Sequence, residues 1–196
     1  MKKDLISIKD LTSKEIEELF DLAVKLKRNK LKFNKVLAGK TLALIFQKPS
    51  NRTRVSFEVG MYQLGGNSVY LSPGEINLGV RETVKDAAKT ISRYVDGIVL
   101  RTFEQKNCLD MAQAASVPVI NGLSDFSHPC QALADLFTIG EKFSRLNQAS
   151  RKLGSRLKGL TLAYVGDGNN VCNSLLFAAA RTGMNIAVAT PGGYAP

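Results

Sequence analysis

Apolar residues follow two alternating patterns along the chain. In some segments they recur every three or four residues, which is the spacing of one helix face, and in others they form short runs typical of buried strands. The runs predict strands over residues 41–46, 68–71, 97–101, 117–121, 160–165 and 186–190. The helical spacing predicts helices over residues 16–24, 52–64, 81–95, 104–115, 129–143 and 171–182, and Gly65-Gly66 is expected to stop the second of them. Thr12 and Glu15 have the spacing of a capping box before the first helix.

Strands that alternate with helices predict an α/β fold, in which mostly parallel sheets are covered by helices on both faces. We expect two doubly wound parallel-sheet domains. The boundary between residues 1–143 and residues 144–196 is expected at the basic and polar segment 144–158. The second sheet would hold only about two strands, which is too few for an independent core.

Ligands of such sheets bind beyond the carboxyl ends of the strands. Four polar features are expected there: the loop that begins at Ser50, the residue Arg101, the loop at His128, and the loop that begins at Gly166. All four features are expected at the carboxyl edges of the sheets, and this shared position is the main evidence in the pattern for a binding site.

The first feature is the segment Ser50-Asn51-Arg52-Thr53-Arg54, at the predicted start of a helix. Free N–H groups and the helix dipole attract an anion to such a position, and arginine adds bidentate hydrogen bonds to phosphate oxygens. The segment lacks the glycines of a Walker loop. Simple capping of the helix by Ser50 or Asn51 explains the same residues equally well, so both interpretations stay open.

The second feature is the segment His128-Pro129-Cys130-Gln131. Pro129 suits the first position of a helix. A histidine can donate a hydrogen bond to a carbonyl oxygen, and a glutamine can bind an amide. On spacing alone, a capping histidine and an outward-facing glutamine are favoured. Cys130 is expected to fill space rather than to act as a nucleophile.

Arg101 ends an apolar strand, so it faces either a ligand or an acid such as Glu104. The loop Gly166–Asn170 resembles the start of a dinucleotide fingerprint, but Val171 replaces the last glycine and no acid ends the next strand. We therefore expect an amino-acid substrate there rather than NAD. Asn77 lies in the loop expected over residues 72–79, which contains glycine and proline, and it is a weaker candidate because polar loop residues are usually just solvated.

The formal net charge of +10 is compatible with a nucleic acid, an anionic membrane or a phosphorylated substrate. Much of the excess lies in one run, formed by Lys25, Lys27, Arg28, Lys30, Lys32 and Lys35. Because only Phe33 interleaves with these cations, we expect a solvated surface and no nucleic-acid partner. No long apolar stretch is present, so we expect neither a signal peptide nor a membrane span.

Three widely spaced cysteines, Cys108, Cys130 and Cys172, and a single histidine make a metal site or a disulfide framework improbable. Free thiols suit a reducing compartment, so we expect a cytoplasmic protein.

Together, these loops resemble the aspartate/ornithine carbamoyltransferase family. Ser50–Arg54 resembles its Ser-x-Arg-Thr-Arg phosphate loop and His128–Gln131 its His-Pro-x-Gln motif, with Arg101 between them. Gly166–Asn170, followed by Asn173-Ser174, is similar to the ornithine branch. The resemblance runs essentially from end to end of the chain.

The resemblance implies which residues would bind the phosphate of carbamoyl phosphate. The loop residues that would hold it are Ser50, Asn51, Arg52 and Thr53. Arg101 would contact both the phosphate and the carbonyl oxygen. Asn77 falls where family members use a glutamine or histidine from a neighbouring subunit, and its shorter side chain puts that role in question.

Other residues would bind the carbamoyl group and the second substrate. His128 would polarise the carbonyl and Gln131 would bind the amide, with Pro129 and Cys130 in the same substrate-binding loop. Asn170 would bind ornithine. Arg52, Arg101, His128 and Gln131 would thus be the catalytic residues.

The implied reaction transfers the carbamoyl group of carbamoyl phosphate to the side-chain amine of L-ornithine, giving L-citrulline and phosphate in arginine metabolism. The physical tasks are proximity and stabilisation of developing negative charge. The resemblance implies no metal or organic cofactor. It implies a homotrimer or a higher homo-oligomer, because family members have sites at subunit borders.

The sequence stops at Pro196, before the acidic and Ser-Met loop, the His-Cys-Leu-Pro loop and the final helix of family members. The resemblance therefore implies a C-terminally truncated member, in which residues 1–143 form the complete carbamoyl-phosphate-binding domain and residues 144–196 only the N-terminal part of the ornithine-binding domain. We expect this chain to bind phosphate ligands weakly and to turn over ornithine poorly or not at all. Alternatives are a carbamoyltransferase for putrescine, acylated ornithine or aspartate, and an inactive phosphate-binding fragment. A nucleic-acid-binding module and a nucleotide-dependent oxidoreductase are less favoured.

Overall fold

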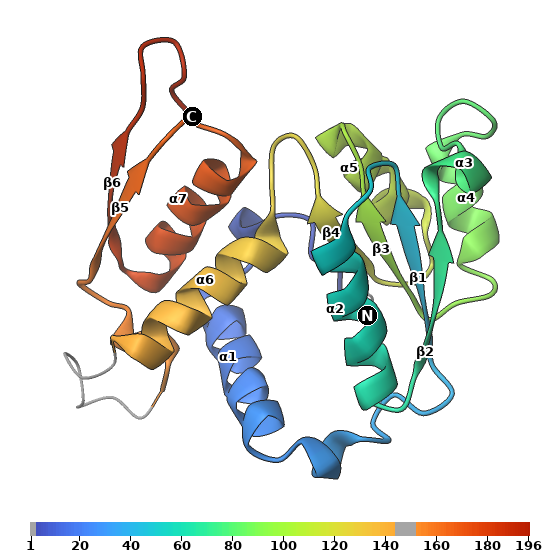
Figure 1. The fold of residues 1–196 in the computed structure, drawn as a ribbon, viewed down its shortest axis with the longest axis horizontal. Coiled ribbons are helices and arrows are strands. Elements are labelled where there is room, and N and C mark those ends of the chain that lie inside the picture. The colour runs from blue at the N-terminus through green and yellow to red at the C-terminus, as the bar shows by residue number, and fades with distance from the viewer. Residues whose placement is uncertain (1–2, 144–151) are drawn as a thin grey trace. The chain divides into compact units, whose positions relative to one another are not determined.

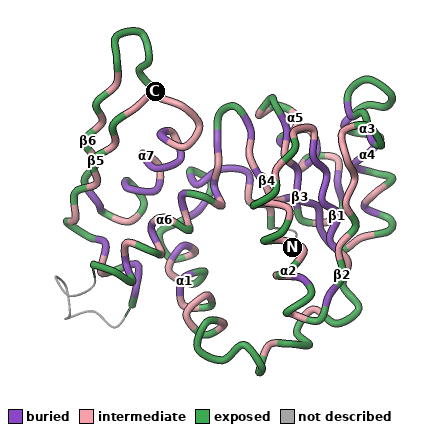
Figure 2. Tube along the Cα trace, in the orientation of Figure 1, coloured by how far each residue is buried: buried purple, intermediate pink, exposed green. Residues whose placement is uncertain are grey.

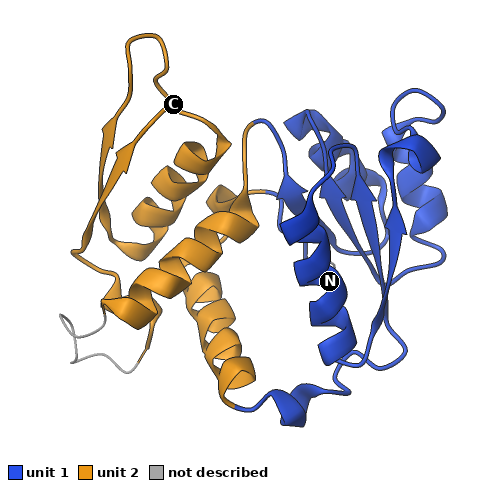
Figure 3. Cartoon of the chain, viewed as in Figure 1, with its two compact units in different colours: residues 1–6, 29–125 blue, residues 7–28, 126–196 orange. Residues whose placement is uncertain are grey.

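The computed structural model describes residues 3–143 and 152–196, so part of the basic segment expected at the domain boundary lies outside the described residues. The chain forms two compact units, coloured blue and orange in Figure 3. Unit 1 comprises residues 1–6 and 29–125, and unit 2 comprises residues 7–28 and 126–196. The boundary between residues 143 and 144 stays a prediction.

Unit 1 is built on a four-stranded sheet with the order β2-β1-β3-β4, in which each pair of neighbours is parallel (Figure 1). The strands are β1 (Thr41–Phe46), β2 (Asn67–Leu71), β3 (Gly97–Arg101) and β4 (Val119–Leu123). The helices are η2 (Lys30–Phe33), α2 (Asn51–Gln63), α3 (Pro73–Ile76), α4 (Val84–Ile91) and α5 (Gln105–Ala114). This arrangement confirms the α/β fold with parallel strands.

The central strands β1 and β3 are buried on both faces of the sheet, because successive side chains of a strand point to opposite faces and both faces are covered. One face packs against α4 and α5 and includes Ala43, Ile45, Ile98, Leu100 and Val119. The other face packs against Met61 of α2 and includes Leu42, Leu44, Phe46 and Val99. In Figure 2, the central strands β1 and β3 are therefore purple along most of their length. Burial on both faces explains why the strands are continuous apolar runs rather than alternating ones.

The order of the strands reverses at β1. The chain places β2 on one side of β1 and then crosses over to place β3 on the other side. In open parallel sheets, the crevice at such a switch point is where ligands bind. The carboxyl ends of β1 and β3 are thus the place in unit 1 where the fold itself favours a site.

β4 lies two residues later in the sequence than the predicted strand over residues 117–121. Pro118 has no N–H to donate, and its carbonyl accepts from Ile98 N at 2.9 Å just before β4 begins. At the other end, the buried Asn121 is compatible with the strand because its side-chain Nδ2 donates to Ile6 O at 3.0 Å. The strand therefore contains a buried polar residue and continues to Leu123.

The segment between β2 and β3 also differs from the prediction. Residues 72–79 were expected to form a loop but include the short helix α3, and α4 covers only part of the helix expected over 81–95. Thr83 starts α4 because its Oγ1 accepts from Asp86 N at 3.1 Å. Ser92 ends it, with its Oγ donating to Ala88 O at 2.6 Å. Local side-chain hydrogen bonds therefore set both ends of α4.

Unit 2 contains helices packed together with a two-stranded parallel sheet. Its helices are η1 (Ile8–Asp10), α1 (Ser13–Arg28), α6 (Pro129–Lys142), η4 (Gly154–Arg156) and α7 (Asn170–Thr182), and its strands are β5 (Thr161–Val165) and β6 (Asn185–Ala189). β5 and β6 confirm the two predicted strands to within one residue at each end. Within residues 3–143 and 152–196, no helix is long and apolar enough to cross a membrane.

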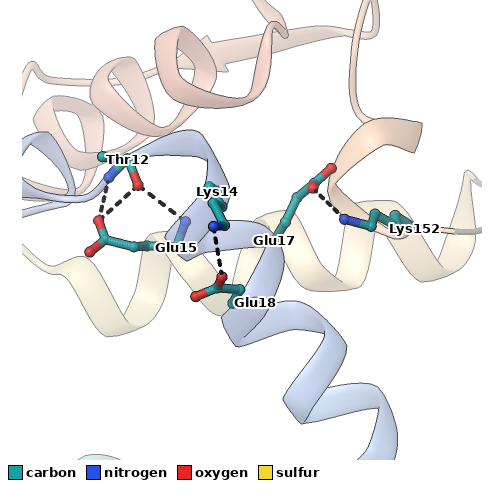
Figure 4. A network of polar contacts seen from close by, with 6 residues as sticks. All are labelled: Thr12, Lys14, Glu15, Glu17, Glu18 and Lys152. Atoms are coloured by element: carbon teal, nitrogen blue, oxygen red, sulfur yellow. Dashed lines mark hydrogen bonds and ion pairs between the residues drawn. The ribbon is translucent and has the colours of Figure 1, made fainter.

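The start of α1 confirms the predicted capping box (Figure 4). Thr12 N donates to Glu15 Oε2 at 2.8 Å, and Glu15 N donates to Thr12 Oγ1 at 3.2 Å. One turn later, Glu17 accepts from Lys152 Nζ at 3.2 Å and from Ser155 Oγ at 2.6 Å, and these hydrogen bonds lower the pKa of Glu17. The first helix is therefore fastened to the segment around η4 within unit 2.

The end of α2 confirms that Gly65-Gly66 stops the helix. Gly65 has a φ of 84°, and a Cβ built there would lie 2.5 Å from Asn34 O. Gly66 N donates to Met61 O at 2.9 Å, which satisfies a carbonyl at the end of the helix. Both the backbone conformation and the lack of space therefore require glycine at position 65.

We predict opposite effects for alanine at two glycines of this helix. Gly65→Ala should lower the free energy of unfolding by about 2 kcal/mol or more, because it combines left-handed strain with a steric clash. Gly60→Ala is the matched control, since nothing lies within 4 Å of its added Cβ. It should raise the free energy by about 0.5–1 kcal/mol. Urea unfolding of both variants measures this, and equal effects would contradict the structure.

Candidate functional site

The loop between β1 and α2 ends in a helix start that no side chain caps. Ser50 occupies the N-cap position with extended backbone angles, but its side chain makes no capping hydrogen bond. The first turn of α2 carries no acidic residue. The structure therefore does not support the alternative explanation of this motif, in which the Ser50 side chain caps the helix. The exposed N–H groups and the helix dipole instead leave an electropositive position at the carboxyl end of β1.

The two arginines of this segment have different environments. Arg54 Nε donates to Glu58 Oε1 at 2.9 Å, and its guanidinium carbon lies 3.7 Å from the centre of the Tyr70 ring. The hydrogen bond with Glu58 raises the pKa of Arg54. Arg52 is exposed and contributes to lowering the pKa of Arg101, so its positive charge acts on the site itself. Of the two, Arg52 is the one available to an anion.

Arg101 is the last residue of β3 and pairs in register with Phe46, the last residue of β1. Its Nη1 donates to Thr53 Oγ1 at 3.4 Å, which brings the strand end to the first turn of α2. Its Nε is buried without a hydrogen-bond partner among the described residues. Burial, followed by the charge of Arg52, lowers the pKa of Arg101. The predicted alternative, a pair with Glu104, is absent from the ion pairs of the described chain.

An arginine stays protonated near neutral pH even when its pKa is lowered. Arg101 therefore holds a partly desolvated positive charge beside Arg52 and the uncapped start of α2, with one donor unused. Each of these features is unfavourable alone, and an anion with several acceptor oxygens would relieve all of them at once. In chemical terms, this part of unit 1 is a candidate phosphate-binding site.

Asn77 lies after α3, on the loop that follows β2. It adopts the left-handed conformation with a φ of 41°, and its carbonyl accepts from Val80 N at 3.1 Å and Arg81 N at 3.0 Å. Its side chain is exposed and is not hydrogen-bonded to the Ser50 loop. The structure thus gives Asn77 a role in shaping its own loop, and its predicted contact with a substrate stays a prediction.

In unit 2, the segment from His128 to Gln131 forms the start of α6. His128 is the N-cap residue but its side chain makes no capping hydrogen bond, and Pro129 takes the first helical position as predicted. Burial raises the pKa of the Cys130 thiol to about 12. Gln131 Nε2 donates to Asp135 Oδ1 at 2.9 Å, so this glutamine lies along the helix surface here.

A buried serine joins this segment to the start of α7. Ser174 Oγ accepts from His128 N at 2.8 Å and donates to Asn170 O at 2.8 Å, and its residue is 1% exposed. The loop before α6 and the first residue of α7 are therefore held together inside unit 2. Two residues predicted to face different substrates, His128 and Asn170, are neighbours in the fold through this one hydroxyl.

The loop after β5 is organised by Asn169 rather than Asn170. Asn169 Oδ1 accepts from Val171 N at 2.9 Å and Cys172 N at 3.3 Å, which caps α7. Tyr164 donates from its hydroxyl to Asp167 O at 2.9 Å and shapes the preceding turn. Asn169 is thus the cap of α7, and the predicted contact of Asn170 with a substrate stays a prediction.

Several residues of the site escaped the sequence analysis. In unit 1 they are Gln47, Thr102 and Asn107, which form a hydrogen-bonded group behind the Ser50 loop and Arg101. In unit 2 it is Ser174, which was noticed only as part of a family motif. No local pattern marks them, because each acts through partners that are distant in sequence. The one available signal is a polar residue directly after a buried strand, as at Gln47 and Thr102.

Comparisons with known proteins agree with this geometry. Residues 3–141 match the family "Aspartate/ornithine carbamoyltransferase, carbamoyl-P binding domain", and residues 158–196 match "Aspartate/ornithine carbamoyltransferase, Asp/Orn binding domain". The gap between the two matches contains the undescribed residues 144–151.

Curated relatives are similar over the whole chain. An ornithine carbamoyltransferase of Thermococcus kodakarensis is 53% identical over 99% of this chain and 59% of its own length. One of Methanocorpusculum labreanum is 50% identical over 100% of this chain and 61% of its own length. The chain thus spans about three fifths of the length of these relatives.

Solved structures give the same result. The ornithine carbamoyltransferase of Pyrococcus furiosus superposes with a TM-score of 0.89 and 48% identity, over 99% of this chain and 59% of that one. A mitochondrial ornithine carbamoyltransferase of Coccidioides immitis superposes with a TM-score of 0.89 and 40% identity, over 100% of this chain and 62% of that one. With both family domains matched across nearly all of its described residues, the chain belongs to the aspartate/ornithine carbamoyltransferase family.

Proposed function

We propose that this chain binds carbamoyl phosphate as part of an enzyme that transfers the carbamoyl group to the side-chain amine of L-ornithine, giving L-citrulline and phosphate. The observation that carries the proposal is the Arg101 guanidinium, with its unused buried donor beside Arg52 and the uncapped start of α2. A phosphate dianion supplies the negative charge and the acceptor oxygens that this arrangement lacks.

The choice of ornithine is supported by the relatives, whose names describe ornithine carbamoyltransferases at 50% and 53% identity. Asn170 fits this choice because it begins α7 next to the His128 loop within unit 2. A carbamoyltransferase for another amine is the alternative, and direct comparison of ornithine with putrescine and aspartate as acceptors decides between them.

In the proposed reaction, the uncharged side-chain amine of ornithine attacks the carbamoyl carbon. A C–N bond forms, the bond from that carbon to the bridging phosphate oxygen breaks, and the proton lost by the amine passes to the departing phosphate. Negative charge develops on the carbonyl oxygen and then on the leaving phosphate. Arg52 and Arg101 would stabilise the phosphate charge, and Arg101 and His128 would donate hydrogen bonds to the carbonyl oxygen.

Gln131 is proposed to bind the carbamoyl amide, which requires its side chain to leave Asp135. The hydrogen bond between these two residues is exposed, so little free energy opposes the change. Pro129 would hold the backbone of this loop at the start of α6. In this proposal, His128 orients and polarises the carbonyl of the carbamoyl group. Gln131 holds the amide of the same group.

Transfer through a thioester on Cys130 is disfavoured. The thiolate is the nucleophilic form of cysteine, and burial raises the pKa of the Cys130 thiol to about 12. Near pH 7, only about one molecule in a hundred thousand would carry the thiolate. Direct attack by the amine is therefore the pathway that the site favours.

Replacing Arg52 tests the phosphate site directly. Arg52→Ala should raise the Kd for phosphonoacetamide, a stable phosphonate analogue of carbamoyl phosphate, by about 30-fold. The reason is that hydrogen bonds between charged groups contribute about 1.5–3 kcal/mol. Calorimetric titration measures the Kd. Arg93→Ala is the matched control, because Arg93 is an exposed arginine of unit 1 that lies outside the site.

Arg93→Ala removes the same charge and should change the Kd by no more than about twofold, which is the general effect of net charge. Equal affinity of the Arg52→Ala variant and the wild-type chain would refute the proposed site. Equal losses in both variants would show that only net charge matters.

We also propose that the chain forms a homo-oligomer, with a trimer as the expectation. The outer face of α2 supports this, because Val55, Val59 and Tyr62 recur at helical spacing and are 54%, 44% and 82% exposed. Val59→Glu should shift the mass in sedimentation equilibrium toward the monomer. Leu109→Glu, on an isolated exposed leucine of α5, should leave the mass unchanged. An identical mass for wild type and Val59→Glu would contradict this interface.

A further inference from the structure

Gln47 is the first residue after β1 and lies three positions before Ser50. Its backbone N donates to Arg101 O at 2.8 Å, so the pairing of β1 with β3 continues past the last residue of the strand. Its side chain is part-buried and makes hydrogen bonds through both ends of the amide. Gln47 is therefore the first residue of the loop that forms the candidate phosphate site.

The amide of Gln47 connects two other segments that border the same edge of the sheet. Its Nε2 donates to Leu78 O at 2.9 Å, in the loop that follows Asn77. Its Oε1 accepts a hydrogen bond from Thr102 Oγ1, on the residue after Arg101. Asn107 Nδ2 donates to Thr102 Oγ1 at 3.0 Å and completes the group. Three loops after β1, β2 and β3 are thus tied to one side chain.

A second contact joins the same loops at the surface. Lys48 Nζ lies 4.3 Å from the centre of the Phe103 ring, so the residues that follow Gln47 and Thr102 also attract each other. Gln47 and Lys48 after β1 are therefore joined by three contacts to Arg101 at the end of β3 and to Thr102 and Phe103 after it. The other residues that would touch a phosphate, Ser50 to Thr53, follow these contacts in the sequence.

We propose that Gln47 is a positioning residue for the phosphate site, which holds the Ser50 loop and the Arg101 strand end at the separation that a phosphate group requires. This inference rests on the proposed function of that site. Gln47 itself is not expected to touch the ligand. Its effect is geometric, because donors must lie within a few tenths of an ångström of the phosphate oxygens to bind them well.

The competing explanation is that Gln47 only stabilises the fold. Thr102 is fully buried, so its hydroxyl needs a partner whether or not a ligand binds. A stabilising role predicts a lower midpoint of thermal unfolding but an unchanged Kd for the protein that remains folded. A positioning role predicts a higher Kd at a temperature where the variant is fully folded.

The test compares Gln47→Met, Thr102→Val and the double variant in the whole chain. Methionine keeps the length of glutamine without its hydrogen bonds, and valine replaces only the hydroxyl of threonine. Gln113→Met, on an exposed glutamine of α5, is the matched control. The measurements are the Kd for phosphonoacetamide by calorimetry, the thermal midpoint, and amide exchange over residues 48–53 and 78–82.

We expect Gln47→Met to raise the Kd about tenfold, which equals about 1.4 kcal/mol, and to speed amide exchange in both segments. Thr102→Val should raise the Kd through the same group, so the double variant should bind no more weakly than Gln47→Met. The control should bind as the wild type does. If Gln47→Met does not fold, the Kd of Thr102→Val decides the question.

A folded Gln47→Met variant, or failing that Thr102→Val, with the Kd of the control would overturn the inference. So would additive losses in the double variant, because they would mean that the two residues act separately. These outcomes are distinct from a failure of the proposed function. In that case the wild-type chain would not bind phosphonoacetamide, or Arg52→Ala would bind it as the wild type does.

Discussion

The parallel pairing of β1 with β3 is the constraint on which the candidate site depends. It places Phe46 opposite Arg101, so both strands end at the same level of the sheet. Because the order of strands reverses at β1, the carboxyl ends of β1 and β3 form the switch point at which parallel sheets of this kind bind ligands. The apolar residues that bury both faces of the sheet therefore also decide which polar residues meet. Exchanging the neighbours of β1 would leave every motif intact and still destroy the site.

This pairing concentrates positive charge where little compensates it. Arg101 is partly desolvated and lies near Arg52, and the start of α2 adds the positive end of a helix dipole. The next arginine, Arg54, is neutralised by Glu58 and packs on Tyr70. The two arginines of this segment therefore have different roles. Arg54 packs within unit 1 against Glu58 and Tyr70, whereas Arg52 is exposed and available to an anionic ligand.

The sequence alone was sufficient for the architecture, since apolar runs buried on both faces are conspicuous and predicted β1 and β3 to the residue. The sequence was insufficient where a residue's hydrogen-bond partner is distant in the chain and determines its conformation. Asn121 stays inside β4 because Ile6 O accepts from its side chain. Similarly, the motif residues were visible, but Gln47 was not, because its partners lie 31 to 60 positions away. Motifs identify ligand contacts, whereas the residues that position them emerge only from the fold.

The most direct test of the central claim is a crystal structure of the chain with phosphonoacetamide bound. We expect the phosphonate to lie at the first turn of α2, with Arg52 and the Nε of Arg101 each within hydrogen-bond distance of its oxygens. Occupation of that position would give the unused buried donor its partner. A phosphonate found only elsewhere, for example among the lysines and arginines near the end of α1, would contradict the account.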